Sequence, residues 1–433
     1  MKNIRTILLA MALTTATGSM AQSDLQQQFA NPPQEARPRV WWHWMNGNIS
    51  KYGIKKDLEW MHRAGIAGIH VFDAGLNTPQ IVPHRITYMT PEWKDCFRYA
   101  VHIADSLGMT MAIPSSPGWS NTGGPWVTPH DAMKKITWRA VRVKGGKKLT
   151  VNLPGIYTTT GHFQNVENTN SPETFSQQIG IVAVRMPDTD IDIASLNPTI
   201  TVSKGKLTVA QLTDGDYSKG TRVEPDAEGN IWAQYTFKKP VTIKALSLSD
   251  GNNRSTWNSC SAPLYYRLET SNDGKTFTKV CDIPQSGTFQ QTIDLSPTTA
   301  RCFRVVCQLP QKDKQGEYVN LMEYNLYTTS RINFAEEKAG FTSFGDLDQY
   351  PSRPDSDVSA AGDVVVLTDK VDADGRLTWN APRGNWVIYR FGTSLFGSRN
   401  GPASPEATGL EVDKMDREAV HKYIAVSYTH LTL

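Results

Sequence analysis

Strand-like and helix-like segments alternate along the chain from Arg39 to Pro114. The runs RVWWHWMNG, AGIHVFDAG and MTMAIP are typical of strands, and a segment with helical spacing follows each of the first two. Ser50 and Thr90 are suited to cap these helices at their amino ends. Three strands joined by helical crossovers must be parallel, so the pattern predicts either a doubly wound sheet or a (β/α)8 barrel.

The residues that follow the strands favour the barrel. WWHWMNG carries aromatic and amide groups where a nucleotide-binding sheet would carry a glycine-rich phosphate fingerprint. In a barrel, the carboxyl ends of the strands form the mouth of the active site. We therefore expect seven residues at these ends to form one substrate-binding rim: His43, Trp44, Asn46, Asp73, Trp119, Ser120 and Trp126.

The loop after the third strand, IPSSPGWSNTGGPWVTP, contains four prolines, three glycines and two tryptophans. Glycine and proline interrupt regular elements, and tryptophan is unusual in a turn, so the composition indicates a binding loop. Trp119 and Trp126 either stack on a sugar ring or pack the loop against the sheet. Strand alternation sends Trp42 and Trp44 to one face and Trp41 to the other, so part of this aromatic set belongs to the core. His43 either bonds a sugar hydroxyl or is a satisfied core histidine.

Two acidic residues are candidates for ligand binding. Asp73 directly follows IHVF, and a carboxylate in such a position is seldom buried without a purpose. It could recognise hydroxyls, ligate calcium or act as a general base, or it could cap the following loop. Asp413 could bind calcium or sugar, or form a salt bridge near the start of the next helix.

The character of the chain changes after about Lys147 to short strands separated by turn residues. We divide it into a first barrel part over 22–146, an inserted β-rich region over 147–335, and a return to the barrel over 336–425. The stretch 202–326 resembles the discoidin-like, galactose-binding-like jelly roll in its LTDGDYS, YYRLETSNDGKTF and ARCFRVVC runs. The predicted fold is therefore α/β, an incomplete (β/α)8 barrel of the TIM type interrupted by a β-sandwich.

The composition limits the kinds of ligand that we expect, and the amino-terminal segment indicates the cellular location. The net charge of +3, without a block of Lys and Arg, argues against nucleic acid and anionic membranes, whereas twelve tryptophans suit neutral, hydroxyl-rich ligands. Residues 1–21 have the pattern of a secretory signal peptide, so we expect export to the periplasm or beyond. No later apolar run is long enough to span a bilayer. The five cysteines are expected to be mostly structural, and Cys302 and Cys307 point to opposite faces of one strand.

The last residues, VSYTHLTL, do not continue the preceding helical pattern. They resemble translated sequencing-adapter read-through, so we expect 426–433 to be a non-native tail. Only three strands precede the inserted region and one or two follow it, whereas a closed barrel has eight. These observations predict a truncated gene product.

Four segments carry a family resemblance: WWHWMNGNIS, AGIAGIHVFDAG, PSSPGWSNTGGPWVTP and PEATGLEVDKMDREAV. Together they resemble the amino-terminal portion of glycoside hydrolase family 106, the α-L-rhamnosidases. The resemblance implies an inverting exo-glycosidase acting on rhamnose-containing plant or pectic glycans, with a calcium ion near the sugar. Inversion uses two carboxyl groups roughly 6.5–9.5 Å apart. The resemblance places the catalytic glutamates beyond Leu433, so we expect this chain alone to be inactive.

Two other interpretations of the function remain open. A secreted, non-catalytic carbohydrate-binding protein would expose Trp232, Trp257 or Tyr266 in a groove of the jelly roll. Another glycosidase family could use the same barrel, because this fold supports many chemistries. Serine-hydrolase and zinc-protease chemistry are disfavoured, since the sequence has neither Gly-x-Ser-x-Gly nor His-Glu-x-x-His.

Overall fold

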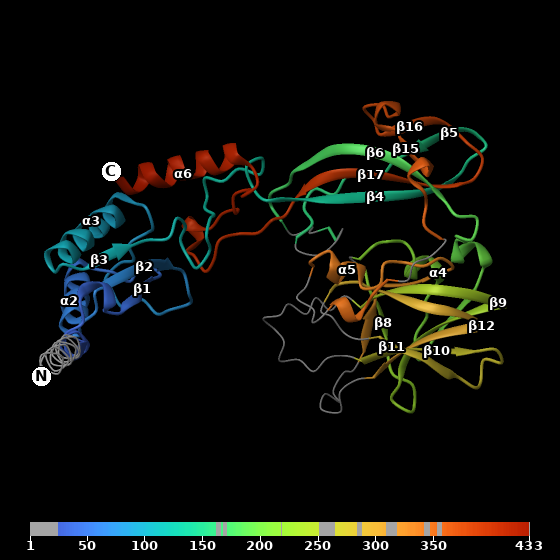
Figure 1. Ribbon diagram of the computed structural model, residues 1–433, viewed down its shortest axis with the longest axis horizontal. Helices are drawn as coiled ribbons and strands as arrows, with labels where there is room; N and C mark the ends of the chain where they lie inside the picture. Colours follow the sequence, from blue (N-terminus) through green and yellow to red (C-terminus); the bar gives the residue numbers. More distant parts are fainter. Residues whose placement is uncertain are drawn as a thin grey trace, which may run out of the picture. The chain divides into compact units, whose positions relative to one another are not determined.

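The computed structural model describes residues 25–161, 166–167, 171–217, 219–250, 265–283, 288–308, 318–341, 347–352 and 357–432 (Figure 1). The expected signal peptide and Trp257 lie outside these residues. The structure is mixed α/β, with mostly strands and few helices. The chain forms two compact units, one made of 1–133 and 398–433 and the other of 134–397. No helix in the described part of the chain combines the length and hydropathy needed to cross a membrane.

The first unit contains a three-stranded parallel sheet in the order β1-β2-β3. Its strands are β1 (Arg39–Met45), β2 (Gly68–Ala74) and β3 (Thr110–Ala112). Its helices are η1 (Gln34–Ala36), α2 (Lys51–Arg63), α3 (Pro91–Ser106), η7 (Pro405–Ala407) and α6 (Arg417–Thr432). The predicted alternation of parallel strands and helices is confirmed.

Local sequence explains where α2 and α3 begin. The Ser50 hydroxyl accepts the Gly53 N–H at 3.1 Å, and the Thr90 hydroxyl accepts the Trp93 N–H at 3.3 Å. Both helices pack on one face of the sheet, against the side chains of Trp42 and Trp44. The opposite face carries Trp41, His43, His70 and Phe72, which are in ring contact with one another.

The second unit includes a four-stranded antiparallel sheet in the order β15-β6-β17-β4. Its strands are β4 (Lys134–Lys144), β6 (Ser176–Met186), β15 (Val364–Val366) and β17 (Asn385–Leu395), and a separate pair joins β5 (Lys147–Asn152) to β16 (Arg376–Ala381). Short 3-10 turns, η4 (Leu347–Gln349), η5 (Ala361–Asp363) and η6 (Thr368–Lys370), lie between these strands in the sequence.

These strand pairings do not follow the boundaries between barrel and insertion that the sequence suggested. β4 was expected in the first barrel part, and β15 to β17 were expected to resume the barrel. The structure pairs all four elements antiparallel within the second unit. The alternation of polar and apolar residues marks a strand but does not identify its partner, so composition alone could not place these boundaries.

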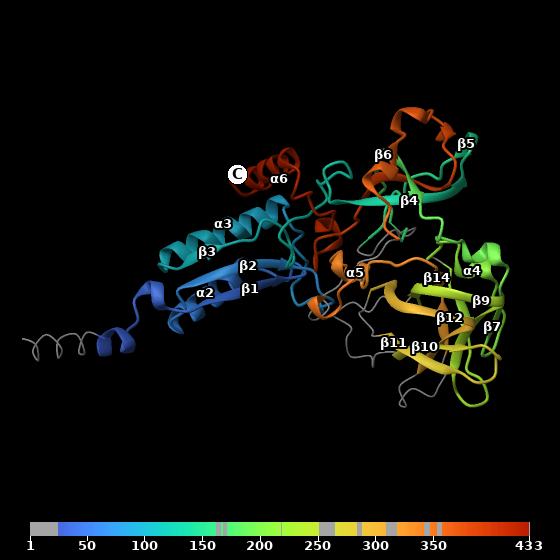
Figure 2. The same cartoon turned by 45° about the vertical axis from the view of Figure 1, so that its right-hand side comes forward.

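The rest of the second unit is built on a six-stranded antiparallel sheet, whose strands β9, β10, β12 and β14 lie side by side in Figure 2. Its strands are β7 (Thr199–Val202), β9 (Ile231–Ser249), β10 (Tyr265–Ser271), β11 (Thr278–Ile283), β12 (Gln291–Gln308) and β14 (Glu323–Tyr327). A two-stranded sheet of β8 (Thr221–Val223) and β13 (Val319–Leu321) contributes Val223, Val319 and Leu321 to the same core. The short helices of this region are η2 (Ile193–Leu196), α4 (Val209–Leu212) and α5 (Ala335–Lys338). None of the four cysteines in the described residues is in a disulfide.

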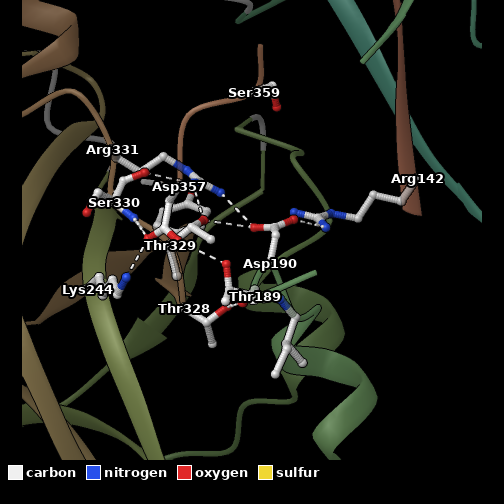
Figure 3. A network of polar contacts seen from close by, with 12 residues as sticks. Arg142, Thr189, Asp190, Lys244, Thr328, Thr329, Ser330, Arg331, Asp357 and Ser359 are labelled. Carbon is white, nitrogen blue, oxygen red and sulfur yellow. Dashed lines mark hydrogen bonds and ion pairs between the residues drawn. The ribbon is translucent and has the colours of Figure 1, made fainter. Parts of the chain in front are cut away.

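Two buried carboxylates join the four-stranded sheet to the six-stranded sheet (Figure 3). Asp190 follows β6 and accepts hydrogen bonds from Arg142 of β4 at 2.6 Å and from Arg331, beyond β14, at 3.3 Å. Asp357 accepts hydrogen bonds from Lys244 of β9 at 2.6 Å and from Thr189 at 2.9 Å. Burial by itself would raise the pKa of Asp190, but the hydrogen bond and charge of Arg142, with Arg331, hold this pKa below its ordinary value.

We expect Asp190→Ala to lower the free energy of unfolding by about 2–3 kcal/mol, because it leaves two arginines without their shared partner. Since the folded-state pKa of Asp190 is depressed, this stabilisation is present above the unfolded-state pKa and is lost as the pH falls through the folded-state pKa. Urea unfolding at neutral pH and at low pH measures both effects. Asp188→Ala is the matched control, because Asp188 is exposed. Equal losses in the two variants would contradict the role of the network.

Candidate functional site

The Gly- and Pro-rich loop, residues 113–129, lies against a second loop, residues 398–412. The N–H of Trp119 donates to the Gly401 carbonyl at 3.0 Å, and that of Gly124 to the Leu410 carbonyl at 3.3 Å. At the carboxyl end of β2, the Asp73 carbonyl accepts the Gly118 N–H at 2.7 Å. The strand end and the two loops therefore form one backbone-bonded rim.

Close backbone approach explains two of the glycines. A Cβ on Gly409 would lie 2.0 Å from the Gly124 carbonyl oxygen, and one on Gly118 would lie 2.6 Å from the Gly401 carbonyl carbon. Gly118 also has a φ of +80°, which other residues adopt at a cost. The glycine content of the loop thus has a structural cause as well as the binding role expected from the sequence.

Asn400 is the buried side chain that connects the two loops. Its Nδ2 donates to the carbonyls of Pro117 and Ala407, both at 3.1 Å, and its Oδ1 accepts the Gly409 N–H at 2.8 Å. The side chain is only 3% exposed. Sequence reasoning missed Asn400, because no local spacing relates it to a loop that lies some 280 positions earlier.

Helix α6 contributes a second connection that was missed. The Tyr423 hydroxyl donates to the Ser115 carbonyl at 2.7 Å and accepts the Gly123 N–H at 3.1 Å. The Tyr423 ring also lies 6.2 Å from that of Trp126, centroid to centroid. Trp126 is half-buried in this contact. This agrees with the alternative in which Trp126 packs the loop rather than stacking on a sugar ring.

His43 and Trp119 come together on the sheet face that α2 and α3 leave uncovered. The Trp119 indole N–H donates to His43 Nε2 at 2.9 Å, and the two rings meet edge to face at 6.0 Å. His43 also stacks on Phe72 at 5.4 Å. Trp119 remains 53% exposed. This pair joins two of the residues expected at the rim and presents a flat aromatic surface to solvent.

Trp44 and Asp73 point to the opposite face of the sheet. Trp44 is 1% exposed and packs edge to face against Trp93, and its indole N–H has no acceptor among the described residues. The structure therefore places Trp44 in the core rather than on the expected rim, because the period of two along β1 turns it toward α3.

Asp73 is 5% exposed and accepts the Trp93 indole N–H at 2.9 Å. Burial raises the pKa of the Asp73 carboxyl to about 7, although the hydrogen bond from Trp93 opposes the rise. A carboxyl with this pKa exchanges a proton near neutral pH. Its side chain faces away from the His43 and Trp119 pair, so the structure does not bring the expected carboxylate and aromatic groups together.

The remaining expected residues, Asn46, Ser120 and Asp413, make hydrogen bonds to the backbone. Asn46 has a φ of 57° and its side-chain amide donates to the Leu76 carbonyl. The Ser120 hydroxyl accepts the Gly401 N–H at 3.0 Å. The Asp413 carboxylate accepts the Met415 N–H at 3.0 Å in the turn before α6. Ser120 therefore supports the loop contact, and Asp413 shapes the turn.

The described residues contain no group of three or more Asp, Glu, His or Cys side chains arranged to hold a metal ion. Neither Asp73 nor Asp413 is therefore part of a ready coordination sphere within the described ranges. The expected calcium ion stays a prediction from the family resemblance.

Comparison with known proteins agrees with this architecture and identifies the class as a glycoside hydrolase. The family model of glycoside hydrolase family 106, alpha-L-rhamnosidase, matches residues 30–431. The chain belongs to this family.

Two relatives illustrate the match. The solved structure of a rhamnosidase from Novosphingobium sp. PP1Y superposes with a TM-score of 0.81 and is 39% identical, over 94% of this chain and 37% of that chain. A protein of Formosa agariphila named "Putative beta-glucuronidase" is 35% identical over 144 residues, which are 33% of this chain and 12% of the relative. The chain thus spans well under two thirds of the length of both relatives.

We expect Asp73→Asn to stabilise the protein at alkaline pH. Because the folded-state pKa of Asp73 is raised to about 7, the stability linked to its protonated form is present below the unfolded-state pKa and is lost as the pH rises through about 7. Asparagine stays neutral and its Oδ1 can still accept the Trp93 N–H. The variant should exceed the parent by up to about 4 kcal/mol at pH 9 and match it at pH 4.

Thermal unfolding at the two pH values measures this difference. Asp57→Asn is a matched control, since Asp57 accepts the Trp42 indole N–H at 3.0 Å but is exposed. No alkaline gain is expected for that variant. A gain of equal size in both variants would show that burial of Asp73 is not the cause.

We expect Asn400→Ala to lower the free energy of unfolding by about 2–4 kcal/mol, because it leaves buried carbonyl and N–H groups of both loops without partners. The loop 113–129 should also become more sensitive to limited proteolysis. Asn121→Ala is the control, because Asn121 is exposed on the same loop. Unchanged proteolysis of the Asn400 variant would show that other contacts are sufficient to hold the loop.

Proposed function

We propose that the chain is part of an exported glycoside hydrolase that removes terminal α-L-rhamnose from plant or pectic glycans with inversion at the anomeric carbon. Membership of the α-L-rhamnosidase family over residues 30–431 supports the reaction class. The observation that carries the substrate-binding part of the proposal is Trp119, an exposed indole held in one orientation at the ends of parallel strands. A fixed aromatic face suits the apolar face of a pyranose ring.

The proposal includes a barrel interrupted by a β-sandwich. The parallel β1-β2-β3 sheet with α2 and α3 supports the first element, and the six-stranded antiparallel sheet supports the second. The rim of a barrel mouth would then contain His43 and Trp119, where barrel enzymes bind substrate. The family resemblance supports catalytic glutamates beyond Leu433 and a calcium ion near the sugar. The signal-peptide pattern of residues 1–21 supports export.

The alternative of a non-catalytic carbohydrate-binding protein places the sugar on the six-stranded sheet. Tyr266 is 3% exposed there and its hydroxyl donates to Asp250 at 2.8 Å. The Trp232 indole N–H donates to Asp226, and the Arg304 guanidinium lies 4.3 Å from the centre of its ring. Tyr266 is therefore buried and a guanidinium lies over the Trp232 ring, whereas the Trp119 indole is 53% exposed, so exposure favours the site at Trp119.

We expect the chain to bind methyl α-L-rhamnoside without hydrolysing aryl α-L-rhamnoside, because the rim is present while the catalytic pair is expected elsewhere. Trp119→Ala should weaken binding at least tenfold, as loss of a central aromatic contact does at other interfaces. Trp232→Ala is the matched control and should retain the parental affinity. Isothermal titration calorimetry measures binding, and release of the aryl group measures hydrolysis.

Two results would contradict these expectations. Loss of binding in Trp232→Ala alone would favour the carbohydrate-binding alternative. Hydrolysis by the chain would show that carboxyl groups within residues 1–433 suffice, and proton NMR of the released sugar would then report inversion or retention. An aryl β-glucuronide in parallel tests the activity in the name of the Formosa relative, and added EDTA tests the calcium.

A further inference from the structure

The hydrogen bond between Trp119 and His43 determines which nitrogen of the imidazole carries the proton. An indole N–H can only donate, so His43 Nε2 must accept with its lone pair. The imidazole in this contact is therefore neutral and carries its proton on Nδ1. His43 cannot maintain the contact once both of its nitrogens are protonated.

The contact fixes an otherwise exposed ring. The backbone of Trp119 is held by the Gly401 carbonyl at 3.0 Å, and the preceding residue is held by the Asp73 carbonyl. The indole itself is 53% exposed, and it meets the His43 ring through a hydrogen bond and an edge-to-face contact. His43 in turn packs on Phe72 of β2 and against Trp41 of its own strand. A rigid histidine therefore sets the orientation of the tryptophan.

The environment of His43 contains few groups that change charge. On β1, Arg39 lies at the far end of the strand and donates to the Thr110 hydroxyl. On β2, His70 packs against Phe72, while Asp73 points through the opposite face to Trp93. Residues 113–126 contain no titratable side chain. Among the described residues named here, His43 and His70 are the imidazole side chains on this face.

We propose that His43 is a positioning residue that orients Trp119 for sugar binding, and that protonation of His43 releases the indole and weakens the site. The proposal rests on the function proposed above, since it describes the regulation of the same rim. Protonation places an N–H opposite the indole N–H, so two donors face each other and the hydrogen bond is lost. The site is then ordered at neutral and alkaline pH and disordered in acid.

The first test observes Trp119 without any ligand. The chain is labelled with 5-fluorotryptophan, and Trp119→Phe identifies the fluorine resonance of Trp119 by its disappearance. Between pH 8 and pH 5 the resonance should shift with a single titration in the parent protein. His43→Gln should abolish the titration, because a glutamine oxygen accepts the indole N–H at every pH in this range. His70→Gln is the matched control and should titrate as the parent does.

The second test measures the affinity for methyl α-L-rhamnoside over the same range. The parent should bind about fivefold more weakly at pH 5 than at pH 8, which corresponds to about 1 kcal/mol. In His43→Gln, the affinity should vary by less than twofold with pH. A merely structural role for His43 would change the affinity at all pH values but would leave its pH dependence in place.

The two tests separate the possible failures. A Trp119 resonance that does not respond to pH, or that titrates equally in His43→Gln, overturns the positioning role. A resonance that titrates as expected in a protein that binds no rhamnoside supports the histidine contact and refutes the proposed function. A titration abolished by His70→Gln assigns the response to His70 and overturns the proposal.

Discussion

The backbone contact between the loops 113–129 and 398–412 is the constraint on which the rim depends. Gly124 and Gly409 approach too closely for a side chain on Gly409, and Asn400 satisfies polar groups of both loops from a buried position. Tyr423 adds a connection from α6. Because the Trp119 backbone is bonded to Gly401, this contact places the backbone that carries the exposed indole before any ligand is present. Preorganisation of this kind lowers the entropy that binding has to overcome.

The alternation of side chains along β1 and β2 divides their residues between two environments. One face, with Trp42 and Trp44, packs against helices and excludes water. The other face, with His43 and Phe72, carries the surface on which Trp119 rests. A shift of one residue in either strand would exchange these sets. The same division explains why Asp73 has a raised pKa, since its position directs the carboxyl into the helix-covered side.

Local features of this fold were predictable, whereas its distant contacts were not. The caps at Ser50 and Thr90 and the spacing of apolar residues locate α2 and α3, because these signals act within a few residues. The interaction of Asn400 with Pro117 depends on the folded chain and leaves no periodic trace in the sequence. For Asp73, the sequence indicated an unusual carboxylate, but only the fold shows that its partner is Trp93. The binding roles assigned to the rim stay predictions.

The pairing of β4 with β17 has a consequence for how the chain folds. Lys134, the first residue of β4, is the register partner of Leu395, the last residue of β17. The second unit therefore begins and ends at neighbouring points, and its folding brings Met133 and Ser398 together. During synthesis the first unit remains incomplete until residues 398–412 leave the ribosome. By then residues 134–397 have been synthesised, and their folding brings the two parts of the first unit close together. The rim therefore forms with a much smaller loss of chain entropy than if these residues were unfolded.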